Sequence, residues 1–142
     1  MFTGEYRHTV DEKGRLAVPA RFRAQLADGA VVARWLDECL AIFPKPAWED
    51  LATKVRGLPI TDAGARNFQR YLFAGAFEAE LDRQGRVLVP QGLRQFAGLG
   101  GEAVVVGLVD HAEIWAPSRW EDYRKAQEDP DVLAQHLTGL GI

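Results

Sequence analysis

The sequence predicts a mainly β fold with short helices, built from two tandem copies of one unit. Residues 6–23 and 77–94 match at an offset of 71 with six of eighteen positions identical. The match resumes at an offset of 72 over residues 42–50 and 114–122. In both copies apolar and polar residues alternate before a glycine-containing turn, a pattern typical of a half-buried strand that enters a hairpin. An ordered match over most of fifty residues indicates a duplication.

Each copy is expected to contain the same elements in the same order. Proline at 19 or 90 suits the first position of a short helix, and glycine at 29 or 98 suits its end. In the first copy we expect strands at 6–10 and 16–18, a helix from 19 to about 29, strands at 31–36 and 40–43 joined at Asp37-Glu38, and a closing helix. In the second we expect strands at 77–81 and 87–89, a helix from 90 to about 98, strands at 103–109 and 112–115 joined at Asp110-His111, and a helix that begins with a capping box from Ser118 to Glu121.

The remaining segments connect or follow the two copies. Thr61 to Ala74 is expected to form a helix with Ala65, Phe68 and Leu72 on one face, capped by Thr61 or Asp62. Residues 130–142 carry apolar side chains at roughly helical spacing, which either dock on a neighbour or fray. The expected organisation is therefore a first repeat at 5–50, a helical connector at 51–75, a second repeat at 76–122 and a helical or flexible tail at 123–142.

Composition places the chain among ordinary globular proteins. Its 142 residues are 47% hydrophobic and 26% charged, and no stretch reaches the roughly 20 apolar residues of a membrane span. Cys39 is the single cysteine, so no intrachain disulfide forms, and residues 1–7 lack the apolar run of a signal peptide. We therefore expect a cytoplasmic protein without a membrane partner.

The distribution of charge is more informative than its sum. The net charge of -3 and the pI of about 5.6 argue mildly against a nucleic-acid partner, because phosphate contacts need lysine and arginine. Residues 6–23, however, hold five cations against two acids, whereas residues 119–131 hold five acids against three cations. A basic N-terminal segment and an acidic C-terminal segment are compatible with the net charge and with the pI.

The two turns share residues that shape the backbone. Aspartate at the first position and glycine at the fourth are the preferences of a type I turn. The aspartate accepts backbone N–H groups within such a turn, and glycine takes the positive φ that a three-residue hairpin loop with a bulge requires. The residues expected to shape the turns are Asp11, Gly14, Asp82 and Gly85.

An arginine follows each turn at the root of the second strand. Arg15 and Arg86 are kept in both copies while their neighbours differ. Arginine suits bidentate contact with guanine edges or with phosphates. The simpler interpretation is a stable hairpin with an exposed Asp–Arg pair; we assign that role to the aspartates and DNA contact to the arginines.

These residues resemble a known family. The pattern Asp-x-Lys-Gly-Arg-apolar-x-apolar-Pro resembles the AbrB/MazE/SpoVT swapped-hairpin fold, and two copies behind the opening Phe-x-Gly-Glu-Tyr-x-His resemble the MraZ family. The resemblance covers nearly the whole chain. It implies tandem AbrB-like repeats that form a pseudo-dimeric β-barrel with added helices. It also implies a transcriptional regulator of the division and cell-wall gene cluster that assembles into a ring and binds repeated short promoter boxes of double-stranded DNA.

The resemblance assigns the Asp-x-x-x-Arg motifs to Asp11/Arg15 and Asp82/Arg86. The second copy departs from the pattern, because Gln84 replaces lysine and Glu78 and Glu80 precede the turn. We therefore expect the first copy to be the stronger DNA contact. The residues expected to bind DNA are Arg15 and Arg86, supported by Arg7, Lys13, Arg83, Arg21 and Arg23. The expected location is the cytoplasm, in association with the nucleoid.

Other functions have less support in the sequence. An alternative is a protein-interaction or ring-assembly scaffold of the same fold that does not read DNA, which the acidic balance favours. Three histidines without metal-ligand spacing and scattered carboxylates give no basis for a metal site, a cofactor, a small-molecule substrate or an enzyme. The tryptophans are expected in the core or at subunit contacts: Trp35, Trp48, Trp115 and Trp120.

Overall fold

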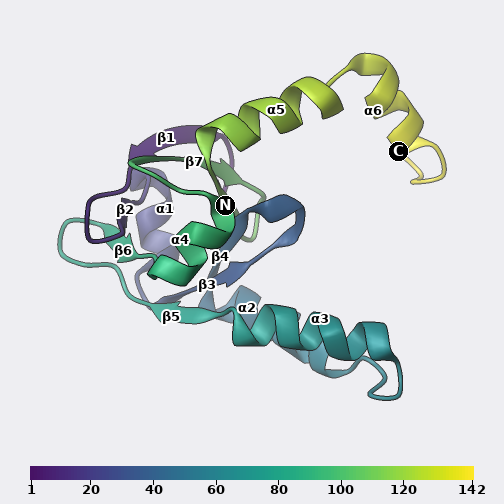
Figure 1. Ribbon diagram of the computed structural model, residues 1–142, viewed down its shortest axis with the longest axis horizontal. Coiled ribbons are helices and arrows are strands. Elements are labelled where there is room, and N and C mark those ends of the chain that lie inside the picture. The colour runs from purple at the N-terminus through teal and green to yellow at the C-terminus, as the bar shows by residue number, and fades with distance from the viewer.

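The computed structural model describes residues 1–142 as an open antiparallel sheet with a small second sheet and helices on both faces (Figure 1). The large sheet has six strands in the order β1-β7-β8-β4-β3-β5, and β2 and β6 form the second sheet. The strands are β1 (Glu5–Thr9), β2 (Arg15–Ala17), β3 (Ala30–Arg34), β4 (Leu40–Pro44), β5 (Phe77–Ala79), β6 (Arg86–Leu88), β7 (Glu102–Gly107) and β8 (Ala112–Trp115).

The two repeats exchange strands. β1 of the first repeat pairs with β7 of the second, with Tyr6 opposite Val105, and β5 of the second pairs with β3 of the first, with Phe77 opposite Val32. β2 and β6, one from each repeat, pair with each other. Each unit therefore cannot complete its sheet without the other, which confirms the prediction of tandem swapped hairpins.

The mainly β fold with short helices is confirmed, but the sheets do not close into the expected pseudo-dimeric β-barrel. β1 and β5 are the edges of the large sheet, and neither pairs with the other. Around the first turn, the bridge between Val10 and Leu16 and the bond from Asp11 N to Arg15 O, 3.0 Å, link the backbones of the two arms. Because the arms diverge toward different partners, β2 and β6 cover the sheet through side-chain packing and do not continue its hydrogen-bond ladder.

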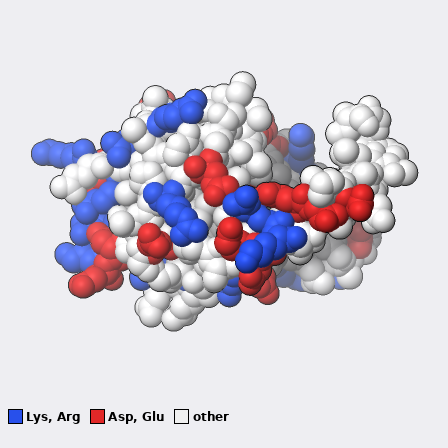
Figure 2. All heavy atoms as spheres, turned by 90° about the horizontal axis from the view of Figure 1, so that it is seen from above, with Lys and Arg blue, Asp and Glu red and all other residues white.

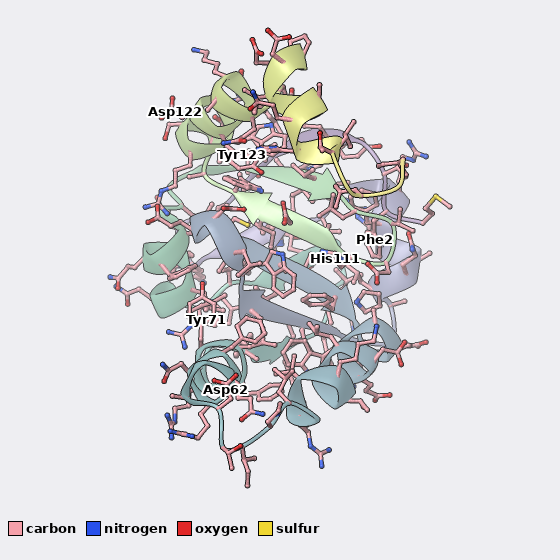
Figure 3. All side chains as sticks on the ribbon, turned by 90° about the vertical axis from the view of Figure 1, so that its right-hand side faces the viewer. Phe2, Asp62, Tyr71, His111, Asp122 and Tyr123 are labelled. Atoms are coloured by element: carbon pink, nitrogen blue, oxygen red, sulfur yellow. The ribbon has the colours of Figure 1, made fainter.

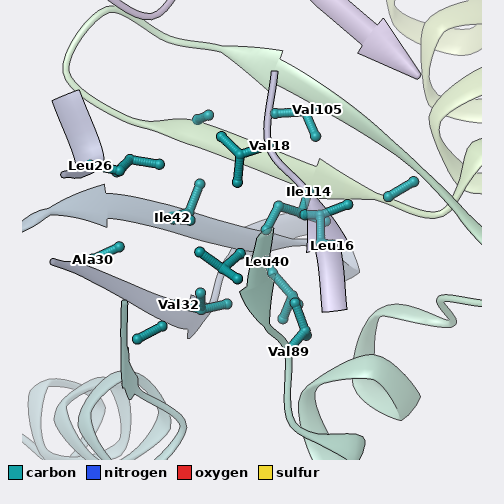
Figure 4. Close-up of a cluster of buried hydrophobic side chains, with 14 of the residues drawn as sticks. Leu16, Val18, Leu26, Ala30, Val32, Leu40, Ile42, Val89, Val105 and Ile114 are labelled. Carbon is teal, nitrogen blue, oxygen red and sulfur yellow. The ribbon is translucent and has the colours of Figure 1, made fainter. Parts of the chain in front are cut away.

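The main core lies between the large sheet, the β2–β6 ribbon and the short helices α1 (Ala20–Arg23) and α4 (Gln91–Ala97). Figure 4 shows side chains from the sheet and the ribbon meeting in one apolar cluster. Leu16 and Val87, which face each other across the ribbon, are 1% and 0% exposed. Burying such side chains stabilises by about 1.5–3 kcal/mol each, so this cluster is the main reason that the ribbon stays in place.

The opposite face of the sheet carries longer helices. α2 (Lys45–Arg56) and α3 (Ala63–Ala74) cover one half of the face, where Leu72 packs on Ala33, and α5 (Pro117–Gln127) covers the other half beside Trp115. α6 (Pro130–Leu137) follows α5 and has no buried residue. Figure 3 shows the sheet face between the two groups of helices, with His111 in the middle.

Helix ends differ in part from the expectation. Pro19 and Pro90 precede the helices as N-caps and do not occupy their first positions, since both have extended ψ angles, 134° and 153°. α5 begins at Pro117 after Ala116, and no side chain caps it, so the predicted capping box at Ser118 was wrong. Proline preorganises that first turn without it.

Other predicted ends are confirmed. Asp62 accepts the N–H of Gly64 at 2.9 Å and begins α3, as expected. Gly98 ends α4 with a φ of 66°, and the first helix continues as a 3₁₀ turn (Ala24–Leu26) before Gly29. A second 3₁₀ turn (Leu36–Glu38) joins β3 to β4. No helix of the chain is both long and apolar enough to span a bilayer.

Candidate nucleic-acid interface

The first turn holds Arg15 against its own aspartate. Gly14 N–H donates to the carbonyl of Asp11 at 3.0 Å, which closes a type I turn, and Gly14 has a φ of +85°. One carboxylate oxygen, Asp11 Oδ1, accepts the N–H groups of Lys13 at 3.0 Å and Arg15 at 2.9 Å. The other, Oδ2, accepts Arg15 Nε at 2.7 Å, so the carboxylate fixes both the turn and the guanidinium.

The second turn repeats this geometry. Asp82 Oδ1 accepts the N–H groups of Gln84 and Arg86, both at 2.9 Å, and Oδ2 accepts Arg86 Nε at 2.8 Å. The pKa values of Asp11 and Asp82 lie below the ordinary range, chiefly because the backbone N–H of the following arginine donates to the carboxylate. Both side chains therefore stay ionised at neutral pH and keep orienting the arginines.

The β2–β6 ribbon presents a short outer face. Side chains alternate along a strand, so Leu16 and Val87 face the core while their neighbours point away from it. The outer face carries two cross-strand pairs, Arg15 with Leu88 and Ala17 with Arg86. The repeat relates Arg15 to Arg86 and Ala17 to Leu88, so an approximate twofold axis passes through the Leu16–Val87 pair.

The two arginines are not equivalent. Arg86 Nη1 also lies 3.4 Å from Asp11 Oδ2, so Arg86 joins both turns, whereas the terminal nitrogens of Arg15 donate to no protein acceptor. The Arg15 side chain is 35% exposed and that of Arg86 is 25% exposed. Arg15 consequently has both terminal nitrogens free for an external acceptor, and Arg86 has one.

A second pair of arginines, Arg23 and Arg94, packs against the turn glycines. A β-carbon at Gly14 would lie 2.6 Å from Arg94 Nε, and one at Gly85 would collide with Arg23 in the same way. Each arginine thus packs on the turn glycine of the other repeat, and the turns are held side by side by bonds from Val89 N to Gly14 O, 2.8 Å, and from Val18 N to Gly85 O, 3.0 Å. Arg23, expected among the DNA contacts, has this structural contact and also donates Nε to Val18 O at 3.1 Å.

The other cations expected at the interface lie on the two turns, on β1 and on α1. Lys13 and Arg83 lie exposed on the two turns, Arg7 lies exposed on the edge strand β1, and Arg21 on α1 donates to the hydroxyl of Tyr6 at 3.0 Å. Both turns project on the left in Figure 1, away from α2, α3, α5 and α6. The turns therefore bring Lys13, Arg83 and the two ribbon arginines together, and Arg7 and Arg21 stand to the side.

The surface at the turn end carries mixed charge. Figure 2 shows lysine and arginine side chains projecting at the left end of the molecule, with acidic side chains among them. On the two turns, Asp11 and Asp82 form ion pairs with Arg15 and Arg86. On the face shown in Figure 2, positive and negative side chains therefore alternate at this end of the molecule.

Reasoning from the sequence missed two kinds of residue in this region. Leu88 is 42% exposed on the ribbon beside Arg15, although its apolar character suggested a strand residue like its neighbours. Arg94 was not chosen, yet it is the counterpart of Arg23 and makes the matching contact. The signal for Arg94 was present, since positions 23 and 94 are identical in the two repeats.

Comparisons with known proteins agree on one family. The family model described as "MraZ protein, putative antitoxin-like" matches residues 1–71 and again residues 72–136. The chain is 52% identical over 141 residues to "Transcriptional regulator MraZ" of Roseiflexus castenholzii, and the match covers 99% of both chains. Proteins of the same name from Herpetosiphon aurantiacus and Moorella thermoacetica are 48% identical over 143 residues, with 100% of each chain covered.

Proposed function

Since the chain belongs to the MraZ family, whose members compared above are named transcriptional regulators, we propose that it regulates transcription by binding specific sequences in double-stranded DNA. The observation that carries this proposal is the outer face of the β2–β6 ribbon, where Arg15 and Arg86 are held by carboxylates at 2.7 Å and 2.8 Å. A two-stranded ribbon fits the major groove of B-DNA. A guanidinium held at Nε presents its terminal nitrogens to the O6 and N7 acceptors of guanine.

Within this proposal Arg15 is the principal reader. Its two terminal nitrogens are free, whereas Arg86 shares one of its own with Asp11. Lys13 and Arg83 lie exposed on the turns and Arg7 lies exposed on β1; these three serve as phosphate contacts, with Arg21 and Arg23 as supports. Asp11, Gly14, Asp82 and Gly85 shape the turns and do not touch DNA.

The proposal extends to assembly and to the target. We propose a homo-oligomeric ring whose chains each present one ribbon, so that repeated short promoter boxes are bound together. The exposed apolar side chains of the C-terminal segment, Leu133, Leu137 and Leu140, suit a contact between copies and lie on the helical side of the molecule, away from the turns. The proposed target is the promoter region of the division and cell-wall gene cluster, including the protein's own gene, on the cytoplasmic nucleoid.

A gel shift with the Arg15→Ala variant tests the DNA-binding proposal. The probe is the DNA immediately upstream of the protein's own gene. The matched control is Arg56→Ala on α2, because it removes an exposed arginine far from the turns. Arg15→Ala is expected to abolish specific binding while size-exclusion chromatography shows an unchanged assembly. Equal binding by Arg15→Ala and the wild type contradicts the assignment.

The competing function is a scaffold of the same fold that does not read DNA, favoured by the net charge of -3. Salt titration separates the two functions. A DNA reader loses affinity with a log–log slope of roughly 0.9 per phosphate neutralised, whereas a scaffold shows neither a steep slope nor sequence preference.

A further inference from the structure

We infer that Leu88 is a specificity residue that contacts the C5-methyl group of a thymine next to the base read by Arg15, and that the two halves of one DNA site are therefore read differently. The inference rests on the proposed DNA-binding function. It concerns a side chain that neither the repeat motif nor the family resemblance assigns to DNA.

The register of the ribbon places Leu88 among the readers. It lies directly opposite Arg15, and cross-strand neighbours on one face of an antiparallel pair have β-carbons about 4.5–5.5 Å apart. That spacing is comparable to the distance between neighbouring base pairs along a groove, about 3.4 Å. A ribbon that brings Arg15 to a base edge therefore brings Leu88 to the same base step or the next.

The exposure of Leu88 has no explanation within the chain. Its side chain is 42% exposed, while Val87 and Val89 on either side are fully buried. Leu88 is absent from the three apolar clusters of the protein, so it contributes little to the core. An apolar side chain between oriented arginines matches the major-groove edge of thymine, which offers a methyl group beside one acceptor.

The pseudo-twofold axis makes this contact one-sided. The counterpart of Leu88 is Ala17, which lies opposite Arg86 and ends at a single methyl group. Leu88 reaches farther from the strand than Ala17 does, so only the half of the DNA site next to Arg15 gains the apolar contact. The same half receives the arginine with both terminal nitrogens free. Both differences predict stronger discrimination in the half-site that faces Arg15 and Leu88.

The test uses a DNA duplex selected by the wild-type protein from a randomised pool, with each thymine replaced in turn by deoxyuridine. Deoxyuridine removes only the C5-methyl group. For the wild type we expect one thymine in each site whose replacement weakens binding roughly four-fold, the worth of one buried methyl group. Leu88→Ala is expected to weaken binding to the parent duplex and to lose this sensitivity.

A matched variant tests the asymmetry. Ala17→Leu gives the second half-site the side chain that it lacks, and we expect a new deoxyuridine-sensitive position related to the first by the twofold axis of the site. Thermal unfolding of both variants should remain close to that of the wild type, because neither position belongs to the core. Mass measurement in solution confirms that assembly is unchanged.

Outcomes separate the inference from the function on which it rests. If Leu88→Ala keeps the deoxyuridine sensitivity of the wild type, or if the wild type has none, the methyl contact is wrong although DNA binding through Arg15 stands. If Leu88→Ala changes the mass of the assembly, Leu88 is a contact between copies and the inference is overturned. A wild-type protein that selects no sequence from the pool contradicts the proposed function itself.

Discussion

At the scale of single residues, Asp11 organises both arginines of the ribbon. Its Oδ1 accepts two backbone N–H groups, and its Oδ2 accepts Arg15 Nε at 2.7 Å and lies 3.4 Å from Arg86 Nη1. Asp82 bonds only to residues of its own turn. The two aspartates therefore have the same role in shaping a turn and different roles in orienting arginines.

Replacing Asp11 by asparagine separates these roles. The amide oxygen of Asn can still accept the backbone bonds, but its NH₂ group cannot accept from a guanidinium. We expect Asp11→Asn to keep the fold and to weaken DNA binding on the order of ten-fold, the worth of about one hydrogen bond to a charged group. Asp82→Asn should have a smaller effect, because it releases Arg86 alone. Fluorescence anisotropy with labelled DNA measures both, and an equal loss in the two variants contradicts the ranking.

The same aspartate makes stability depend on pH. The backbone N–H of Arg15, first among several donors, lowers the Asp11 pKa below its ordinary value of 3.8. A carboxyl group with a lowered pKa in the folded state stabilises the protein above its unfolded pKa and loses that effect as the pH falls through the folded pKa. Denaturation midpoints of wild type and Asp11→Asn should therefore differ at pH 7 and converge below pH 3.8. A difference that persists unchanged in acid would show that the carboxylate charge is not its source.

At the scale of elements, the turn glycines are constrained to different degrees. Gly14 has a φ of +85°, and a β-carbon there would lie 2.6 Å from Arg94 Nε and 2.8 Å from the carbonyl oxygen of Val89. Gly85 has a φ of +74°, and the three atoms nearest to a β-carbon built there all belong to the Arg23 side chain. A side chain can move aside, whereas a backbone carbonyl in the ribbon cannot.

We therefore expect Gly14→Ala to destabilise the protein more than Gly85→Ala. Both variants lose about 1–2 kcal/mol because a residue with a β-carbon resists the left-handed conformation. Gly14→Ala adds the displacement of the Val89 carbonyl from its place in the ribbon. Urea unfolding of the two variants measures the difference, and the reverse order would place the rigid contact at the second turn.

Local elements were largely predictable from the sequence because they depend on local chemistry. Alternation identified the strands, Asp-x-x-Gly identified the turns, and Asp62 identified the start of α3. The predicted capping box at Ser118 failed because Pro117 already begins the helix one residue earlier. The pairing of the strands was harder to predict from the sequence. β1 and β2 have the pattern of one simple hairpin, although β1 pairs with β7 and β2 pairs with β6.

The candidate site was predictable in part. The repeat pointed to Arg15 and Arg86, and the structure places both on one ribbon face within reach of Asp11. The link from Arg86 to Asp11 joins residues 75 positions apart, so it depends on how the two repeats pack. The exposure of Leu88 likewise follows from the register of β2 with β6, which no pattern within one repeat determines.

At the scale of the whole molecule, the turns and the C-terminal segment lie at opposite ends. The turns project on one side in Figure 1, while α5 and α6 extend on the other. α6 buries none of its residues, and Leu137 and Leu140 are 42% and 65% exposed. An apolar surface of this kind, remote from the ribbon, can contact another copy without hindering access to DNA.

Removing residues 130–142 tests whether this segment assembles the ring. The shortened chain keeps Glu128, which pairs with Arg124 at 3.0 Å, so α5 retains its last contact and the melting temperature should stay near that of the wild type. We expect the mass in solution to fall and the affinity for a single box to change little. Affinity for two or more boxes in the natural spacing should drop by roughly 10²–10⁴, because linked sites raise the effective concentration of each ribbon. A shortened chain that keeps its mass and its multi-box affinity would locate the contact between copies elsewhere, and α2 and α3 would then be the next helices to alter.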